Sequence, residues 1–207
     1  AEVESAVPAL IGHTERAEFK GQDLTGKPTR IKSLVEYEER FGKGPEPLVA
    51  KVVLDAQNNV ASASLDSTYV LYDSIRLFFA NGGGKCYIVS VGGYHDDLSK
   101  KEFEKGLEQL RREDEPTMLL FPDATKFPST NELYALQKAA LRQAGDLMDR
   151  FVIMDLAPSA DTTRWSDTVK EFRSGIGIES LKYGAAYTPY LKTGLSKEIR
   201  FRTIHDK

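Results

Sequence analysis

The sequence predicts an α/β fold: a mainly parallel sheet with helices on both faces, in three layers, and a β-rich N-terminal portion. Three apolar runs of strand length, at residues 86–91, 118–121 and 151–155, alternate with segments of helical periodicity. This alternation is typical of βαβ units, which build parallel sheets with right-handed crossovers. The run at 86–91 is continuously apolar, as expected for a strand covered on both faces.

The N-terminal portion is expected to begin with a strand and a short helix. An apolar run at residues 7–12 ends at a glycine, and its Pro8 suits the start of a strand or an edge strand. A helix is predicted from Ser33 to about Gly42, because Glu36 follows Ser33 by three positions, the spacing of a capping box.

A β-hairpin is expected next. Residues 48–54 are rich in valine, residues 57–59 form a polar turn, and residues 60–64 are expected to return as the partner strand.

The next segment has the apolar spacing of an α-helix. Asp66 or Ser67 is expected to cap a helix that runs to Asn81, since apolar residues recur on one broad face. The remaining predicted elements are helices at 99–112, 129–149 and 168–172 and strands at 118–121, 151–155 and 184–191.

Glycine-rich segments do not predict a phosphate site. The glycines at 82–84 follow a helix and precede a strand, whereas a phosphate-binding loop follows a strand and opens a helix. We therefore expect Gly82 or Gly83 to adopt the left-handed conformation of a helix C-cap. The Gly-x-Gly at 175–177 is interpreted as a loop, and the pair at 92–93 lacks the lysine and hydroxyl residue of a phosphate loop.

Two aspartates are the candidates for chemistry. Asp123 and Asp155 each follow an apolar strand, and ligands bind at the carboxyl ends of parallel strands. A magnesium-dependent hydrolase or nucleotide-binding enzyme that uses both carboxylates is the alternative function. The competing interpretation is that each carboxylate hydrogen-bonds loop backbone locally, since no third ligand or nucleophile accompanies the pair.

No other residue predicts a catalytic, cofactor or metal site. The three histidines, His13, His95 and His205, lack metal-ligand spacing, and Cys86 is expected to be an inert buried thiol in a strand. The chain is therefore not expected to be an enzyme, and no cofactor is expected.

Composition excludes several classes of protein. Of the 207 residues, 41% are hydrophobic and 29% are charged, which is ordinary for a globular domain. The net charge of −3 provides no basic field for nucleic acid, and no stretch approaches the ~18 apolar residues of a membrane span. A single cysteine is compatible with a reducing compartment.

The chain is expected to divide into three parts. Residues 1–65 form a β-rich segment packed on the core, residues 66–191 form the α/β core, and residues 192–207 form a basic linker or terminal strand. Ile199 and Phe201 alternate with arginines like a half-apolar strand, which is typical of a segment that links one subunit to another. Both ends of the chain are expected at the surface of the domain.

Six segments carry a resemblance to a known family: residues 1–15, 72–84 continuing into 86–91, 122–124, 133–137, 149–155 and 181–187. Together they resemble the contractile phage tail sheath proteins, especially the sheath subunits of phage-like extracellular contractile injection systems, which are protein-translocation particles. The segments lie in the order of the family's motifs and span almost the whole chain.

The resemblance implies a structural role. Sheath subunits polymerise as stacked six-fold rings around an inner tube and contract to drive the tube through a target envelope. The implied partners are identical or homologous sheath subunits, the inner tube protein, and baseplate and tail-terminator proteins, with no nucleic acid and no membrane for the free subunit. The resemblance also implies synthesis in the bacterial cytoplasm and a place in a phage tail or a released extracellular particle.

Overall fold

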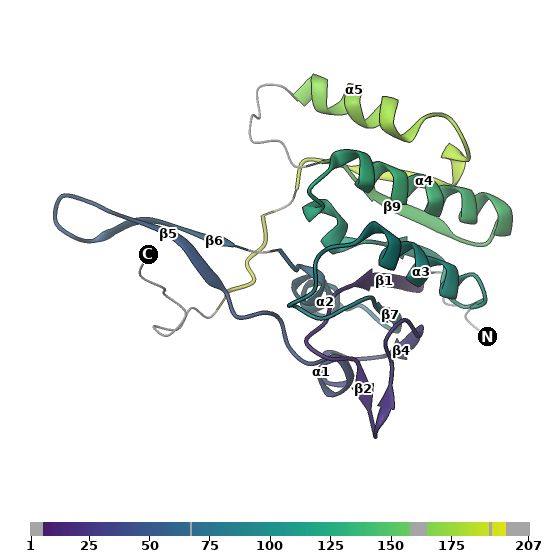
Figure 1. The fold of residues 1–207 in the computed structure, drawn as a ribbon, viewed down its shortest axis with the longest axis horizontal. Coiled ribbons are helices and arrows are strands. Elements are labelled where there is room, and N and C mark those ends of the chain that lie inside the picture. Colours follow the sequence, from purple (N-terminus) through teal and green to yellow (C-terminus); the bar gives the residue numbers. More distant parts are fainter. Residues whose placement is uncertain (1–5, 67, 158–164, 191, 198–207) are drawn as a thin grey trace.

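A six-stranded sheet forms the centre of the molecule (Figure 1). The structure is a computed structural model that describes residues 6–66, 68–157, 165–190 and 192–197. The strands are β1 (Pro8–Gly12), β2 (Glu18–Phe19), β3 (Gln22–Asp23), β4 (Thr29–Ile31), β5 (Leu48–Leu54), β6 (Val60–Asp66), β7 (Cys86–Ser90), β8 (Met118–Leu120), β9 (Phe151–Asp155) and β10 (Gly184–Tyr187). The α-helices are α1 (Leu34–Phe41), α2 (Leu71–Ala80), α3 (Lys100–Leu110), α4 (Thr130–Leu147) and α5 (Trp165–Ile176), and the 3₁₀ helices are η1 (Pro122–Lys126) and η3 (Leu181–Tyr183).

The sheet is mainly parallel, as predicted. Its strand order is β10-β9-β8-β1-β7-β4, and every pairing is parallel except that of β4 with β7. Two further antiparallel pairs, β2 with β3 and β5 with β6, lie outside it. The β-rich character of the N-terminal region is therefore also confirmed.

β1 lies in the middle of the sheet, between β7 and β8. Leu10 pairs with Ile88 on one side and with Leu120 on the other, and all five residues of β1 are buried. Pro8 is tolerated in this central strand because it is the first residue of the strand. β1 is thus part of the α/β core, although the sequence assigned it to a segment packed on that core. The division at residues 65 and 66 stays a prediction.

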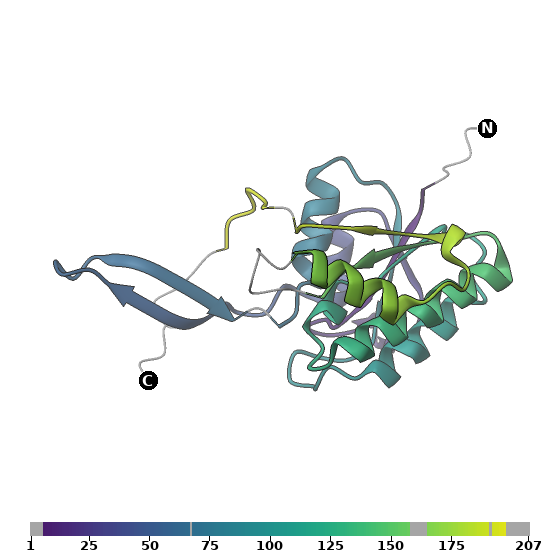
Figure 2. The ribbon, with the colours of Figure 1, turned by 90° about the horizontal axis from the view of Figure 1, so that it is seen from above.

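Helices lie on both faces of the sheet, which confirms the three-layer arrangement. Figure 2 shows α3, α4 and α5 side by side on one face and α2 on the other. One hydrophobic cluster lies on each face of the sheet, and successive residues of β1 point to opposite faces. Ala9 and Ile11 belong to the first cluster, with residues of α3 and α4. Leu10 belongs to the second cluster, with residues of α1 and α2. The second cluster is formed by Tyr37, Phe41, Leu71, Ile75, Ile31, Cys86 and Ile88 together with Leu10.

The helix predictions differ from the structure mainly at the helix ends. Ser33 caps α1 as predicted, since its Oγ accepts a hydrogen bond from the Glu36 N–H at 3.2 Å. The helix expected to start at Asp66 or Ser67 instead starts at Leu71, and no side chain of its own N-terminus caps it. This expectation was wrong because the hairpin strand β6 continues to Asp66.

Two elements near the C-terminus also differ from the prediction. α5 spans Trp165–Ile176 rather than residues 168–172, so Gly175 lies in its last turn and not in a loop, and Gly177 follows at φ +75°. β10 ends at Tyr187, before Pro189. Cys86 is buried, as predicted, and burial raises the pKa of its thiol to about 12.

Gly82 adopts the left-handed conformation predicted for the end of α2. Its φ is +80°, and the N–H of Gly83 donates to the carbonyl of Phe78 at 2.9 Å, which closes the last turn.

We expect Gly82→Ala to lower the free energy of unfolding by about 1 kcal/mol, because a side chain at this φ is strained. The matched control is Gly84→Ala, where an added Cβ meets no atom within 4 Å and the φ needs no glycine. Urea unfolding of both variants measures the difference, and equal stabilities would contradict the left-handed cap.

The described C-terminal residues run over α2. The guanidinium of Arg76 donates to the carbonyl of Ser196 at 3.3 Å, and the amine of Lys197 lies 2.8 Å from the Asp73 carboxylate. Residues 1–5 and 198–207, which include Ile199 and Phe201, lie outside the described residues. Within the described part of the chain, no helix combines the length and the apolar character needed to cross a bilayer.

Candidate functional site

A long β-hairpin, β5–β6, projects from the domain (Figure 1). The strands pair antiparallel, with Val53 opposite Ser62. Asp55 organises the turn, since its Oδ1 accepts the N–H of Gln57 at 2.9 Å and that of Asn59 at 2.8 Å. The sequence predicted this strand pair, but it did not predict that the pair would stand apart from the sheet.

The projecting hairpin exposes aliphatic side chains. Val60 is 64% exposed and Leu54 is 52% exposed, and Val52 and Val53 are exposed as well. Within the described residues, neither β5 nor β6 pairs with any strand other than its partner. A two-stranded hairpin is marginally stable alone, and unpaired edges are templates for another strand. The hairpin is therefore a candidate contact surface.

Asp123 links the start of α2 to the end of β1. The carboxylate is buried in η1, and its Oδ1 accepts the N–H of Val70 at 2.6 Å and that of Leu71 at 2.8 Å. Its Oδ2 accepts the N–H of His13 at 2.7 Å, directly after β1. Asp123 therefore supplies the cap that α2 lacks locally, and joins the segment after β6 to the end of β1.

These hydrogen bonds correct one part of the expectation for Asp123. The carboxylate does bind backbone N–H groups, as predicted, but its partners lie 52 to 110 residues away in the sequence rather than in its own loop. Burial raises the pKa of Asp123 to about 6, while the three N–H donors act in the opposite direction.

His13 lies beside Asp123 in the core. Its ring contacts Tyr69 and Phe103, with centroids 5.2 and 5.7 Å away, and its Nδ1 lies 3.8 Å from the Asp123 Oδ2. Burial lowers the pKa of His13, so its ring is neutral at pH 7.

Gly12 makes room for the Asp123 carboxylate. A Cβ on Gly12 would lie 2.6 Å from the Asp123 Oδ2 and 3.2 Å from the Leu71 side chain. We expect Gly12→Ala to displace the carboxylate and to lower the free energy of unfolding by about 2 kcal/mol. Gly84→Ala, placed in open space, is the control, and chemical denaturation is the measurement. A variant as stable as the control would show that the carboxylate can move at no cost.

Asp155 occupies a different environment at the end of β9. Its backbone carbonyl accepts a hydrogen bond from the Gln137 side-chain amide at 2.9 Å. Burial alone raises the pKa of its carboxyl group to about 6. No hydrogen bond to that carboxyl group is found within the described residues, so local bonding to loop backbone, expected for Asp155, is not seen there.

The two aspartates do not form a joint site in the described part of the chain. They share no hydrogen-bond partner, and both oxygens of Asp123 are engaged by backbone N–H groups. Among the residues that the structure describes, no group of three His, Cys, Asp or Glu is placed to hold a metal ion. His95 and Cys86 join neither aspartate by a hydrogen bond or ion pair, and His205 lies outside the described residues.

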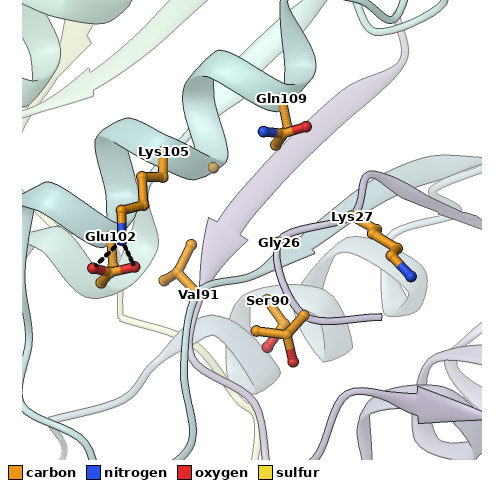
Figure 3. A pocket seen from close by; sticks show the side chains of 9 residues that line it. Gly26, Lys27, Ser90, Val91, Glu102, Lys105 and Gln109 are labelled. Atoms are coloured by element: carbon orange, nitrogen blue, oxygen red, sulfur yellow. Dashed lines mark hydrogen bonds and ion pairs between the residues drawn. The ribbon is translucent and has the colours of Figure 1, made fainter. Parts of the chain in front are cut away.

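A groove of about 400 Å³ lies at the carboxyl end of β7, between the loop 25–27 and α3 (Figure 3). Its cations are already engaged: Lys105 binds Glu102 at 2.7 Å, and Lys27 donates to the carbonyl of Asp23. Figure 3 shows Glu102 and Lys105 facing each other on one turn of α3. In the described part of the chain, no hydrogen bond joins a hydroxyl group of this groove to one of its charged side chains.

Comparison with solved structures shows which proteins share this fold. The chain is similar to the baseplate of the anti-feeding prophage (AFP) in its contracted state, at 19% identity and a TM-score of 0.63, over 96% of this chain and 46% of that one. It is also similar to the contracted AFP helical sheath, at 17% identity and a TM-score of 0.50, over 90% of this chain and 40% of that one. No protein-family model and no curated protein matches the sequence.

The matched chains are components of one kind of particle. This chain spans less than half of the length of each. The resemblance seen in the sequence motifs and the likeness of the folds agree, because both lead to components of contractile particles. The chain therefore has the α/β fold found in the AFP baseplate and helical sheath.

Proposed function

We propose that the chain is a structural subunit of a contractile tail sheath, which polymerises as stacked six-fold rings around an inner tube and contracts to drive that tube through a target envelope. The observation that carries the proposal is the match of 96% of the chain to a component of the AFP baseplate. The similarity to the AFP helical sheath supports the sheath role.

The architecture suits a mechanical part. Contraction of such a lattice requires subunits that move as rigid bodies between two packings. Two hydrophobic clusters, one on each face of the sheet, make the α/β core of this chain a rigid unit. The hairpin β5–β6 extends beyond that unit and offers exposed aliphatic side chains to a neighbour.

The proposal includes partners and a location. The partners are other sheath subunits, the inner tube protein, and the baseplate and tail-terminator proteins. The subunit is made in the bacterial cytoplasm and becomes part of a phage tail or a released particle. It works without catalysis, which is supported by the engagement of Asp123 in backbone hydrogen bonds.

Electron microscopy tests this function directly. The chain is co-expressed with the tube and baseplate proteins of a contractile particle, and the particles are viewed in negative stain. Long hollow cylinders that contain the chain, identified by a tag at its N-terminus, are the expected result. Particles in which the tube carries no outer cylinder made of the chain would contradict the proposal.

A further inference from the structure

Half of one face of the sheet carries no helix of the described chain. α1 and α2 cover β4, β7 and β1, and the last strand residue in contact with their cluster is Leu120 of β8. Val152 and Met154 of β9 are buried against the opposite layer, so Phe151, Ile153 and Asp155 point to the uncovered face.

The uncovered face continues onto the edge strand β10. Ala185 pairs with Ile153, and Tyr187 pairs with Asp155. Ala186 packs against the first hydrophobic cluster, so Ala185 and Tyr187 lie on the uncovered face with Phe151 and Ile153. We call these four residues the β9–β10 face.

β10 adds a free edge to this apolar face. It is the outermost strand of the sheet and pairs only with β9 among the described strands. Tyr187 is 64% exposed, and Leu181 and Tyr190, which flank the strand, are also exposed. Among the described residues, the Tyr187 side chain and the outer backbone edge of β10 are therefore open to a partner, whereas Phe151, Ile153 and Ala185 are half-buried.

We propose that the β5–β6 hairpin of a second copy of this chain docks on the β9–β10 face. Among the described residues, most of the large exposed apolar side chains fall into two groups: Val52, Val53, Leu54 and Val60 on the hairpin, and Leu181, Tyr187 and Tyr190 in or beside β10. The hairpin projects away from the sheet in both views, so a second molecule is the natural source of the contact (Figures 1 and 2).

Both surfaces carry charges of both signs. The exposed Lys51 and Asp55 of the hairpin can pair with Asp155, which lies beside Tyr187, and with the exposed Lys182 before β10. The hairpin also brings unpaired strand edges to the unpaired edge of β10, so that backbone hydrogen bonds can add to the apolar contact.

A contact between two different surfaces of the same chain is head-to-tail. Such contacts close into rings or continue as helical arrays, in contrast to the two-fold pairing of identical surfaces. The inference deepens the proposed function, on which it rests for the expectation that copies of the chain assemble.

The experiment uses two variants, each of which removes one surface. The hairpin variant carries Val53→Glu and Val60→Glu, and the face variant carries Tyr187→Glu; all three positions are exposed, so we expect both variants to fold. The matched control is Val35→Glu on α1, which is 75% exposed and lies outside both surfaces. Light scattering after size exclusion measures the mass at rising concentration, and circular dichroism verifies the fold.

Mixing the variants gives the decisive result. The native chain and the control should self-associate, and each variant alone should do so at least about tenfold more weakly. An equimolar mixture should form a dimer that does not grow, because one hairpin and one face remain intact. A native chain that stays monomeric, a variant that associates like the native chain, or a mixture without dimers would each overturn the inference.

The outcomes also separate this inference from the proposed function. If the hairpin variant still builds hollow cylinders with the tube protein, the hairpin contact is wrong while the sheath role stands. If the mixture forms the dimer but the native chain builds no cylinders, the contact is right and the sheath role is wrong.

Discussion

Replacing Asp123 by alanine should lower the free energy of unfolding by about 3–5 kcal/mol. The carboxylate is fully buried and accepts three backbone N–H groups, from His13, Val70 and Leu71. Each buried N–H left without an acceptor costs about 1–3 kcal/mol, and relief of the burial of the charge offsets part of the sum. The effect should be local as well as global, since the start of α2 loses its attachment to the end of β1.

Urea unfolding measures this loss, and hydrogen exchange at the amides of Val70 and Leu71 locates it. Asp123→Asn retains one acceptor oxygen and should be less destabilising than alanine. Asp114→Ala is the matched control, because Asp114 is an exposed carboxylate for which no hydrogen bond is found within the described residues. A change below about 1 kcal/mol for Asp123→Ala would mean that water replaces the carboxylate as acceptor.

Replacing Asp155 by asparagine should have the opposite sign and raise the free energy of unfolding at pH 7 by about 2–3 kcal/mol. Burial raises the pKa of Asp155 from 3.8 to about 6, so folding at pH 7 confines a charge where the neutral form is preferred. Each unit of that shift is worth about 1.4 kcal/mol, and asparagine has a similar shape without the charge.

The pH dependence provides the internal check. For a carboxyl group whose pKa is raised in the folded state, the penalty is fully present above pH 6 and disappears as the pH falls below 3.8. The free energy of unfolding of the native chain should therefore rise as the pH falls from 7 to 4. In Asp155→Asn, the part of this rise that comes from protonation of Asp155 should be absent.

Asp123 also titrates near pH 6, so some dependence should remain in the variant. Asp114→Asn, which also removes one negative charge but at an exposed position, is the control. Lower stability of Asp155→Asn at pH 7 would show that the carboxylate has a stabilising partner.

The two aspartates also show how far sequence reasoning reaches. Their position after apolar strands correctly placed them at the carboxyl ends of β8 and β9. The pattern could not tell that Asp123 binds backbone N–H groups whereas Asp155, within the described residues, does not. That difference depends on which distant segments of the chain pack against each strand end. Only Asp123 meets the start of α2 and the end of β1, which come from distant parts of the chain.

Features set by neighbours in the sequence were predictable from it. The N-cap at Ser33, the left-handed Gly82, the valine-rich hairpin and the apolar strands each depend on residues within a few positions, so local rules apply. The resemblance of the motifs to sheath proteins likewise needed only the order of short segments.

The tertiary structure alone decided the rest. The sequence by itself determined a parallel α/β fold, whereas strand order put β1 at the centre of the sheet and β10 at its edge. Among the described residues, it also left the β9–β10 face without a covering helix and set the hairpin apart from the core. The physical reason is that hydrophobic burial fixes which residues leave water but is non-directional, so the pairing of distant segments follows from packing the whole chain.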